Sequence, residues 1–359
     1  MTADSIEKSL KEEFPDATEA ECFRFVQAAK AVHKKANAKL DKDKLIKDTA
    51  SEKLEEYLEW RSLYGLDYDR PAKDADDSSI WEWAARKALG AAETKKREAE
   101  ALRAAVEAKR AADREARLKA KRGDVDDKPP KVDYDAMREQ VMREEELART
   151  GGGDDGQTDD EENNDSKCIG EGKAESKTTL PQVFFRRKDP KTGKLLCDKK
   201  GTELIHVLAA RIDRFATDNE TWALAVALYI DASVDRNSKH SFAILVDARS
   251  GEGWPNPVIL MIVSLIGQIV TEIEKRQPER CKSLIICPLP RALMMVWGTV
   301  RGFYSAEMNE LIIAFSGPSG IGSPLPKKKL DPHVEDATIE FFEQCRRDLF
   351  VCEVEDEKV

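Results

Sequence analysis

Cysteine and histidine are scarce in this 359-residue chain, and neither is arranged as a metal site would require. The seven cysteines are an odd number without a Cys-x-x-Cys pair, which argues against a disulfide framework and a structural zinc site. The four histidines are dispersed without ligand spacing. Acidic pairs and nucleophile-base pairs in a recognisable catalytic pattern are also missing. We therefore expect no metal, no cofactor and no enzymatic activity.

Long apolar runs are missing as well. The longest covers residues 258–270, is interrupted by Ser264, Gly267 and Gln268, and falls short of the roughly 20 residues that a membrane span needs. The N-terminus has no basic segment followed by an apolar core, and the chain has no lipidation motif. These absences predict a cytoplasmic protein.

Charged residues are abundant, at 36% of the chain, and they are concentrated in the middle. Residues 84–122 contain almost no large apolar side chains, and their 13 Lys and Arg against 6 Asp and Glu give a net charge of +7. Residues 144–165 reverse this balance, with 10 acidic residues against one Arg around three consecutive glycines. The first segment predicts a solvated helix and the second a disordered acidic linker.

Two parts of the chain have the patterns of packed structure. Residues 16–70 carry Phe25, Val26, Leu54 and Leu58 at helical spacing, which predicts a compact helical unit. From residue 180 onward, apolar strand-like runs alternate with helical segments. The expected strands are 204–208, 242–247, 283–287 and 311–315, and the expected helices are 217–230, 257–275, 291–300, 305–310 and 334–351. This alternation predicts parallel crossovers and an α/β fold with a mostly parallel sheet flanked by helices. The Gly317-Pro318-Ser319-Gly320 segment predicts a loop.

Several motifs occur in a fixed order along these two parts. They are Cys22-Phe23-Arg24-Phe25-Val26-Gln27-Ala28-Ala29-Lys30, Leu58-Glu59-Trp60-Arg61-Ser62-Leu63-Tyr64-Gly65, Pro278-Glu279-Arg280, Pro288-Leu289-Pro290 at a strand end, and Arg301-Gly302-Phe303-Tyr304. In order and spacing the chain resembles the CRAL-TRIO lipid-binding domains of the yeast-type phosphatidylinositol-transfer proteins. The family has Asn-Ala-Pro at the fourth motif and Lys-Pro-Phe-Leu at the fifth. The resemblance covers residues 16–70 and 180–316, and it implies a hydrophobic lipid pocket behind a small helical domain.

The resemblance also implies headgroup-binding residues. In phosphoinositide-binding members, the Glu of Pro-Glu-Arg, the Lys of Lys-Pro-Phe-Leu and the Arg-Lys of the N-terminal motif converge on the inositol phosphate. The matching candidates here are Glu279 with its neighbour Arg280, then Arg301, and Lys30, while Ala29 replaces the Arg. Glu279 and Arg280 fit equally well an alternative role, a helix-to-strand corner held by surface ion pairs.

Candidate pocket and gate residues come from one strand and one helix. Phe242 and Ile244 stand where phosphatidylcholine-binding members have polar residues, which argues against choline recognition in that mode. Between 292 and 297 the apolar residues are consecutive, so they cover more than one face of a helix. We expect Leu293, Met294, Met295 and Trp297 to form a gate, since methionine adapts to irregular partners and tryptophan suits a membrane interface.

The expected organisation is a helical domain at 1–77, a charged linker at 78–179, a lipid-binding lobe at 180–316 and a C-terminal loop and helix at 317–359. The expected function is binding and transfer of a phospholipid, a phosphoinositide or an isoprenoid-type lipid, with transient contact to membranes and no nucleic-acid partner. The alternative is a signalling or trafficking adaptor that uses the charged linker to dock a protein partner.

Overall fold

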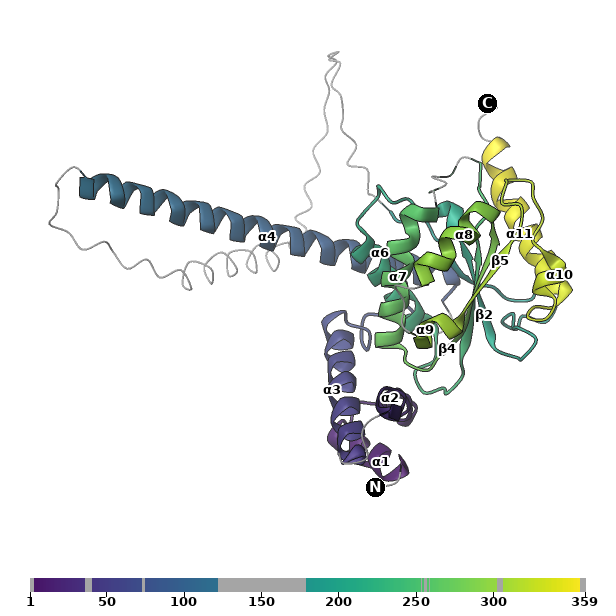
Figure 1. Cartoon of the computed structure of the whole chain (residues 1–359), viewed down its shortest axis with the longest axis horizontal. Helices are drawn as coiled ribbons and strands as arrows, with labels where there is room; N and C mark the ends of the chain where they lie inside the picture. Colours follow the sequence, from purple (N-terminus) through teal and green to yellow (C-terminus); the bar gives the residue numbers. More distant parts are fainter. Residues whose placement is uncertain are drawn as a thin grey trace, which may run out of the picture. The chain divides into compact units, whose positions relative to one another are not determined.

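The computed structural model describes residues 3–35, 41–72, 75–121, 179–252, 254, 257, 259–301 and 306–355 (Figure 1). The chain divides into two compact units. One comprises Met1–Gly90 with Thr178–Val359, and the other comprises Ala91–Lys177. The first unit contains the N-terminal helices and the sheet.

The N-terminal part is helical, as the apolar spacing predicts. Its elements are α1 (Ala3–Glu13), α2 (Glu19–Val32), the 3-10 turn η1 (His33–Lys35) and α3 (Lys42–Leu63). Thr18 and Glu21 form a capping box that starts α2, and the Asp41 side chain caps α3. The rings of Phe25 and Tyr57 pack with centroids 5.5 Å apart between α2 and α3. α1 is an addition to the predicted elements.

The rest of this unit is built on a five-stranded sheet. Its strands are β1 (Phe184–Arg186), β2 (Glu203–Leu208), β3 (Phe242–Asp247), β4 (Cys281–Leu289) and β5 (Ile312–Ser316). They lie side by side in chain order, with β1 antiparallel to β2 and all other pairs parallel. This confirms an α/β fold with a mostly parallel sheet. β4 extends beyond the expected stop at Pro288, and its pairing with β5 is irregular between Ile286 and Leu289.

Helices cover both faces of the sheet (Figure 1). They are the 3-10 turn η2 (Ala209–Arg211), α6 (Asn219–Ser233), α7 (Ile259–Arg276), α8 (Arg291–Val300), α9 (Ala306–Leu311), α10 (Lys327–Leu330) and α11 (Asp336–Glu355). α6, α7 and α8 connect successive parallel strands on one face, while α10 and α11 lie on the opposite face. A single hand of crossover places all these connections on the same side.

The two sheet faces belong to two separate hydrophobic clusters. On the α6–α8 face, the buried strand residues include Ile205, Val207, Phe242, Ile244, Val246, Leu284, Ile286 and Ile312. On the α11 face they are Leu204, Ala243, Leu245, Ile285 and Cys287, which pack with residues of α11 such as Ile339 and Phe342. The alternation follows the two-residue period of a strand, and burial on both faces explains why the strands are almost wholly apolar.

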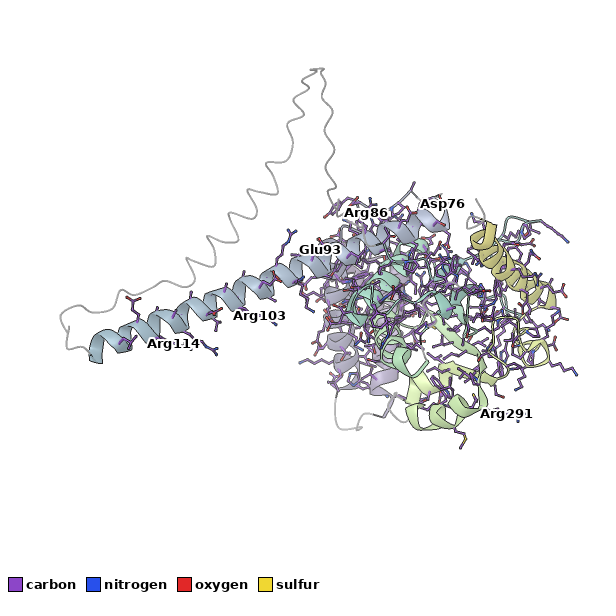
Figure 2. The ribbon with its side chains drawn as sticks, turned by 90° about the horizontal axis from the view of Figure 1, so that it is seen from above. Asp76, Arg86, Glu93, Arg103, Arg114 and Arg291 are labelled. Atoms are coloured by element: carbon purple, nitrogen blue, oxygen red, sulfur yellow. The ribbon has the colours of Figure 1, made fainter. Side chains whose placement is uncertain are left out.

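Helix α4 (Asp77–Lys121) corrects the expected extent of the solvated helix. Its first turns are part of the core, with Ile80, Trp81, Trp83, Ala84, Ala85 and Ala88 all buried. The expectation of a helix with no buried face from residue 84 is therefore wrong for these turns, because alanine packs closely against larger neighbours. Beyond Gly90 the described side chains are mostly exposed, and Arg103 and Arg114 project from the helix (Figure 2).

Candidate functional site

The predicted gate residues occupy opposite sides of α8. The Trp297 side chain is 7% exposed and joins the core on the α6–α8 face, and Met294 packs against the same core. Leu293 is half-buried. Met295 is 82% exposed, the most exposed large apolar side chain among the described residues. The apolar run therefore covers more than one face of the helix, as its length predicts.

The two predicted pocket residues on β3 lie beneath the crossover helices. Phe242 and Ile244 are 1% and 3% exposed, and they share the cluster with Trp297. The backbone N–H of Phe242 donates to the Arg280 carbonyl at 2.9 Å, which ties the start of β3 to the corner before β4. The structure thus places Phe242, Ile244, Met294 and Trp297 in one apolar layer.

Glu279 and Arg280 form the corner between α7 and β4, and they point to different environments. Glu279 has a positive φ of 63° and pairs with Lys282 at 3.5 Å. Arg280 is 1% exposed and donates to the carbonyls of Asp235 and Ser238, the latter at 2.5 Å. Burial and the nearby Arg24 lower the pKa of Arg280 to about 10. Through its hydrogen bonds to these two carbonyls, Arg280 holds the loop between α6 and β3 in place.

The two remaining headgroup candidates lie on other elements. Lys30 is half-buried in the last turn of α2. Arg301 is exposed after α8, where its guanidinium donates to the Asn309 carbonyl at 3.0 Å and Asn309 Nδ2 donates back to the Arg301 carbonyl at 2.8 Å. Within the described part of the chain, no hydrogen bond or ion pair joins Lys30, Glu279 and Arg301 to one another.

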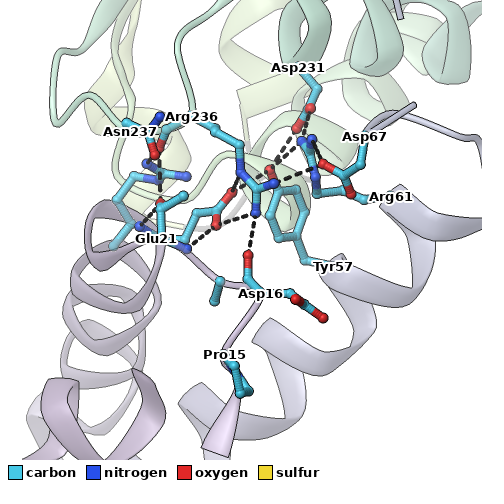
Figure 3. A network of polar contacts seen from close by, with 12 residues as sticks. Pro15, Asp16, Glu21, Tyr57, Arg61, Asp67, Asp231, Arg236 and Asn237 are labelled. Atoms are coloured by element: carbon cyan, nitrogen blue, oxygen red, sulfur yellow. Dashed lines mark hydrogen bonds and ion pairs between the residues drawn. The ribbon is translucent and has the colours of Figure 1, made fainter. Parts of the chain in front are cut away.

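A largely buried polar network, which no sequence pattern predicted, joins the N-terminal helices to α6 and the loop after it (Figure 3). Arg61 bridges Asp231 of α6 and Asp67, with 2.7 Å to Asp67. The Tyr57 hydroxyl donates to Asp231 Oδ2 at 2.7 Å, and it accepts a hydrogen bond from Arg61 at 3.2 Å. The Arg236 guanidinium donates to both carboxylate oxygens of Glu21, at 3.0 and 2.9 Å. α2 and α3 are therefore fixed to α6 and the loop that follows it.

Burial is the largest single influence on the pKa values of this network, but ion pairs reverse its direction for Glu21 and Arg61. It raises the pKa of Tyr57 well above its ordinary value, and the neighbouring Asp231 carboxylate adds to the effect. For Glu21, burial opposes ionisation, but Arg236 and the Thr18 N–H hold its pKa below the usual value. Burial alone would lower the pKa of Arg61, and Asp231 reverses that effect. A signal existed in the sequence, since Asp231 directly follows an unbroken apolar run from Trp222 to Ile230.

The described residues contain no cluster of histidine, cysteine, aspartate and glutamate that could hold a metal ion. None of the helices in the described ranges has the length and apolar character to cross a membrane. Comparison with known proteins gives no matching family model and no matching curated protein. The resemblance to the CRAL-TRIO domain consequently stays a prediction.

Proposed function

We propose that the protein binds a hydrophobic lipid between the sheet and the α7–α8 side of the fold, and transfers it between membranes. The observation that carries this proposal is the sidedness of α8. One ten-residue helix packs Trp297 into the core and directs Met295 outward, where its side chain is 82% exposed. An apolar helix with both an inner and an outer apolar face suits an element that contacts lipid on one side and a membrane on the other.

The energetics of lipid transport favour such a layer. Each methylene removed from water contributes about 0.8 kcal/mol, so long acyl chains supply most of the affinity of a carrier. The layer of Phe242, Ile244, Met294 and Trp297 is apolar throughout and supplies this environment. Met294 has an unbranched, adaptable side chain that can repack around an irregular ligand.

A cation at the end of α8 supports a phosphorylated headgroup. Arg301 follows α8 directly and presents an exposed guanidinium, which can bind a phosphate through two parallel hydrogen bonds. Its intramolecular partner Asn309 is an exchangeable surface contact. Lys30, on α2, is the second cation that the resemblance assigns to the proposed headgroup site. Arg280, held by loop carbonyls, supports the corner rather than the ligand.

We expect replacement of Lys30 and Arg301 by alanine to weaken phosphoinositide binding about tenfold or more, with a smaller effect on uncharged lipids, because each cation contributes a charge-assisted contact. Liposome-to-liposome transfer of labelled lipids measures both classes. Asn309→Ala is the matched control, since it removes the side-chain amide contacts to Arg301, at 3.3 and 2.8 Å, but keeps the cation. An equal loss for charged and uncharged lipids would indicate damaged packing instead.

Met295→Asp tests the proposed function directly. The wild-type protein purified from a eukaryotic host should carry stoichiometric lipid, and the variant should transfer it about tenfold more slowly, because an aspartate reaching hydrocarbon opposes insertion by about 2.5–3.5 kcal/mol. Leu63→Asp is the control, since Leu63 is 75% exposed on α3. The proposal fails if the wild-type protein carries no lipid above background, and α8 is not the gate if Met295→Asp transfers at the wild-type rate.

A second candidate is an adaptor that binds a protein partner through α4. The observation favouring it is a set of exposed apolar side chains on the outer part of this helix: Leu102 at 63%, Val106 at 43% and Leu118 at 57%. Leu102 and Val106 are four residues apart and therefore share one face of the helix. Lipid content distinguishes the candidates, since an adaptor with a collapsed pocket would carry none.

A further inference from the structure

A cleft of 610 Å³ lies on the α11 face of the sheet, opposite the side proposed to bind lipid. It lies between α11 and the segment that follows β5. Its charged lining residues are Arg249, Lys327, Glu340, Glu343, Arg346 and Arg347. Arg249 follows the carboxyl end of β3 and the 321–324 segment follows that of β5. In parallel α/β sheets this edge is the usual place for ligands.

The floor of the cleft is a buried ionic cluster. Asp247, at the end of β3, accepts two hydrogen bonds from the Arg249 guanidinium, at 2.9 and 2.7 Å, and one from Arg346 at 3.3 Å. Arg249 also donates to Glu343 at 2.8 Å and to the Ser323 carbonyl at 2.6 Å. The side chains of Arg249 and Arg346 are 1% and 4% exposed. Two guanidiniums and two carboxylates are thus fixed in position beneath an open cleft.

A purely structural role explains this cluster incompletely. Removing charged side chains from water costs several kcal/mol per ion, and well-packed apolar residues of similar size are often equally stable. The cluster is also ordered from three sides, by β3, α11 and the loop after β5. Such fixed charge at the base of a cleft is the arrangement that binds a polar ligand with little reorganisation.

The rim supplies charges that can change partners. Lys327 pairs with Glu340 at 2.9 Å, and the two side chains are 47% and 67% exposed. Arg347 is exposed and donates to Gln344 at 2.7 Å. Exposed contacts of this kind contribute only about 0–1 kcal/mol, so a ligand can replace them at low cost.

We propose that this cleft binds a phosphorylated polyol. Its lining carries four cations and two carboxylates, Asp247 in the floor adds a third carboxylate, and the resulting net charge of +1 favours an anionic phosphate monoester. Lys327 and Arg347 contact the phosphate, and the carboxylates of Glu340 and Glu343 accept hydrogen bonds from the hydroxyls of the polyol. The volume falls in the range of small-molecule sites. This site is independent of the proposed lipid layer, because the sheet separates the two faces.

The test is isothermal titration calorimetry with myo-inositol 1-phosphate on the full chain. We expect a Kd below about 1 mM for the wild-type protein and at least about tenfold weaker binding for the double variant Lys327→Gln with Arg347→Gln. The control removes two exposed cations outside the cleft lining, Lys200→Gln with Lys328→Gln, and should bind as the wild type does.

Three further ligands test which groups of the probe the cleft recognises and whether the ligand comes from a lipid. Unphosphorylated myo-inositol and inorganic phosphate should each bind much more weakly than the probe. Vesicles containing phosphatidylinositol 4-phosphate show whether the polyol phosphate is a lipid headgroup. If the wild-type protein binds the vesicles and the Lys327→Gln with Arg347→Gln variant does not, the ligand is a lipid headgroup. If only the soluble probe binds, the ligand is a free metabolite. The proposal is overturned if neither binds, if the two double variants lose affinity equally, or if myo-inositol or inorganic phosphate matches the probe.

Discussion

Asp231→Ala should lower the free energy of unfolding by about 3–5 kcal/mol, because it leaves the buried Arg61 guanidinium without its main counter-charge. The Arg61 and Asp231 side chains are 1% and 2% exposed, and the Tyr57 hydroxyl and the Gln277 amide also donate to this carboxylate. Truncation therefore removes the acceptor of three side chains at once. Chemical denaturation followed by circular dichroism measures the loss as a lower midpoint.

Asp67→Ala is the matched control for this prediction. Asp67 also pairs with Arg61, at 2.7 Å, but its side chain is 50% exposed. Water can replace the lost carboxylate there, so the loss should stay near or below about 1 kcal/mol. Equal losses for Asp231→Ala and Asp67→Ala would contradict the claim that burial sets the cost.

A double replacement separates the cost of an unpaired charge from the net contribution of the pair. Arg61→Met combined with Asp231→Leu removes both charges and leaves apolar side chains of similar size. We expect this variant to be more stable than Asp231→Ala by about 2 kcal/mol or more, since no buried ion stays uncompensated. The network then serves mainly to specify how α2 and α3 dock on α6.

The contrast between predicted and missed elements has a physical basis. β3 is predicted with its observed bounds, because a strand buried on both faces is a continuous apolar run that turn residues delimit. β1 is only three residues long, and its pairing with β2 depends on tertiary contacts that a local pattern does not encode. α1 has few apolar side chains, and Ile6 and Leu10 become buried only against other helices.

The candidate site shows the same division. Consecutive apolar residues predict the two-sided exposure of α8, since helix geometry alone distributes them around the axis. The ionic network joins Arg61 to Asp231, 170 residues apart, so only the folded chain brings them together. Arg280 illustrates the limit of a motif. Its position in the sequence suggests a ligand contact, whereas it donates hydrogen bonds to loop carbonyls and to the Gln277 side chain.

Trp81→Ala is the second substitution with a large expected effect, about 3–5 kcal/mol of stability. Trp81 is 1% exposed, and its ring lies 5.6 Å from that of Tyr229 and 6.2 Å from that of Trp222, measured between centroids. Its indole N–H donates to the Leu180 carbonyl at 3.0 Å. The substitution leaves a large cavity and an unpaired carbonyl, so the thermal midpoint should fall by many degrees in differential scanning calorimetry.

Two controls locate this effect within α4. Trp81→Phe keeps most of the ring packing but loses the indole donor, so it should cost less than Trp81→Ala. Deletion of residues 93–173 should change the midpoint by at most a few degrees, because the described side chains in that span are mostly exposed and loop entropy grows only logarithmically with length. If the deletion destabilised the protein as much as Trp81→Ala does, the boundary of the folded unit would lie beyond Gly90. If Trp81→Ala lowers the midpoint strongly and the deletion does not, the packing of Trp81 against Trp222 and Tyr229 holds α4 in the folded unit, and the charged part of the helix does not.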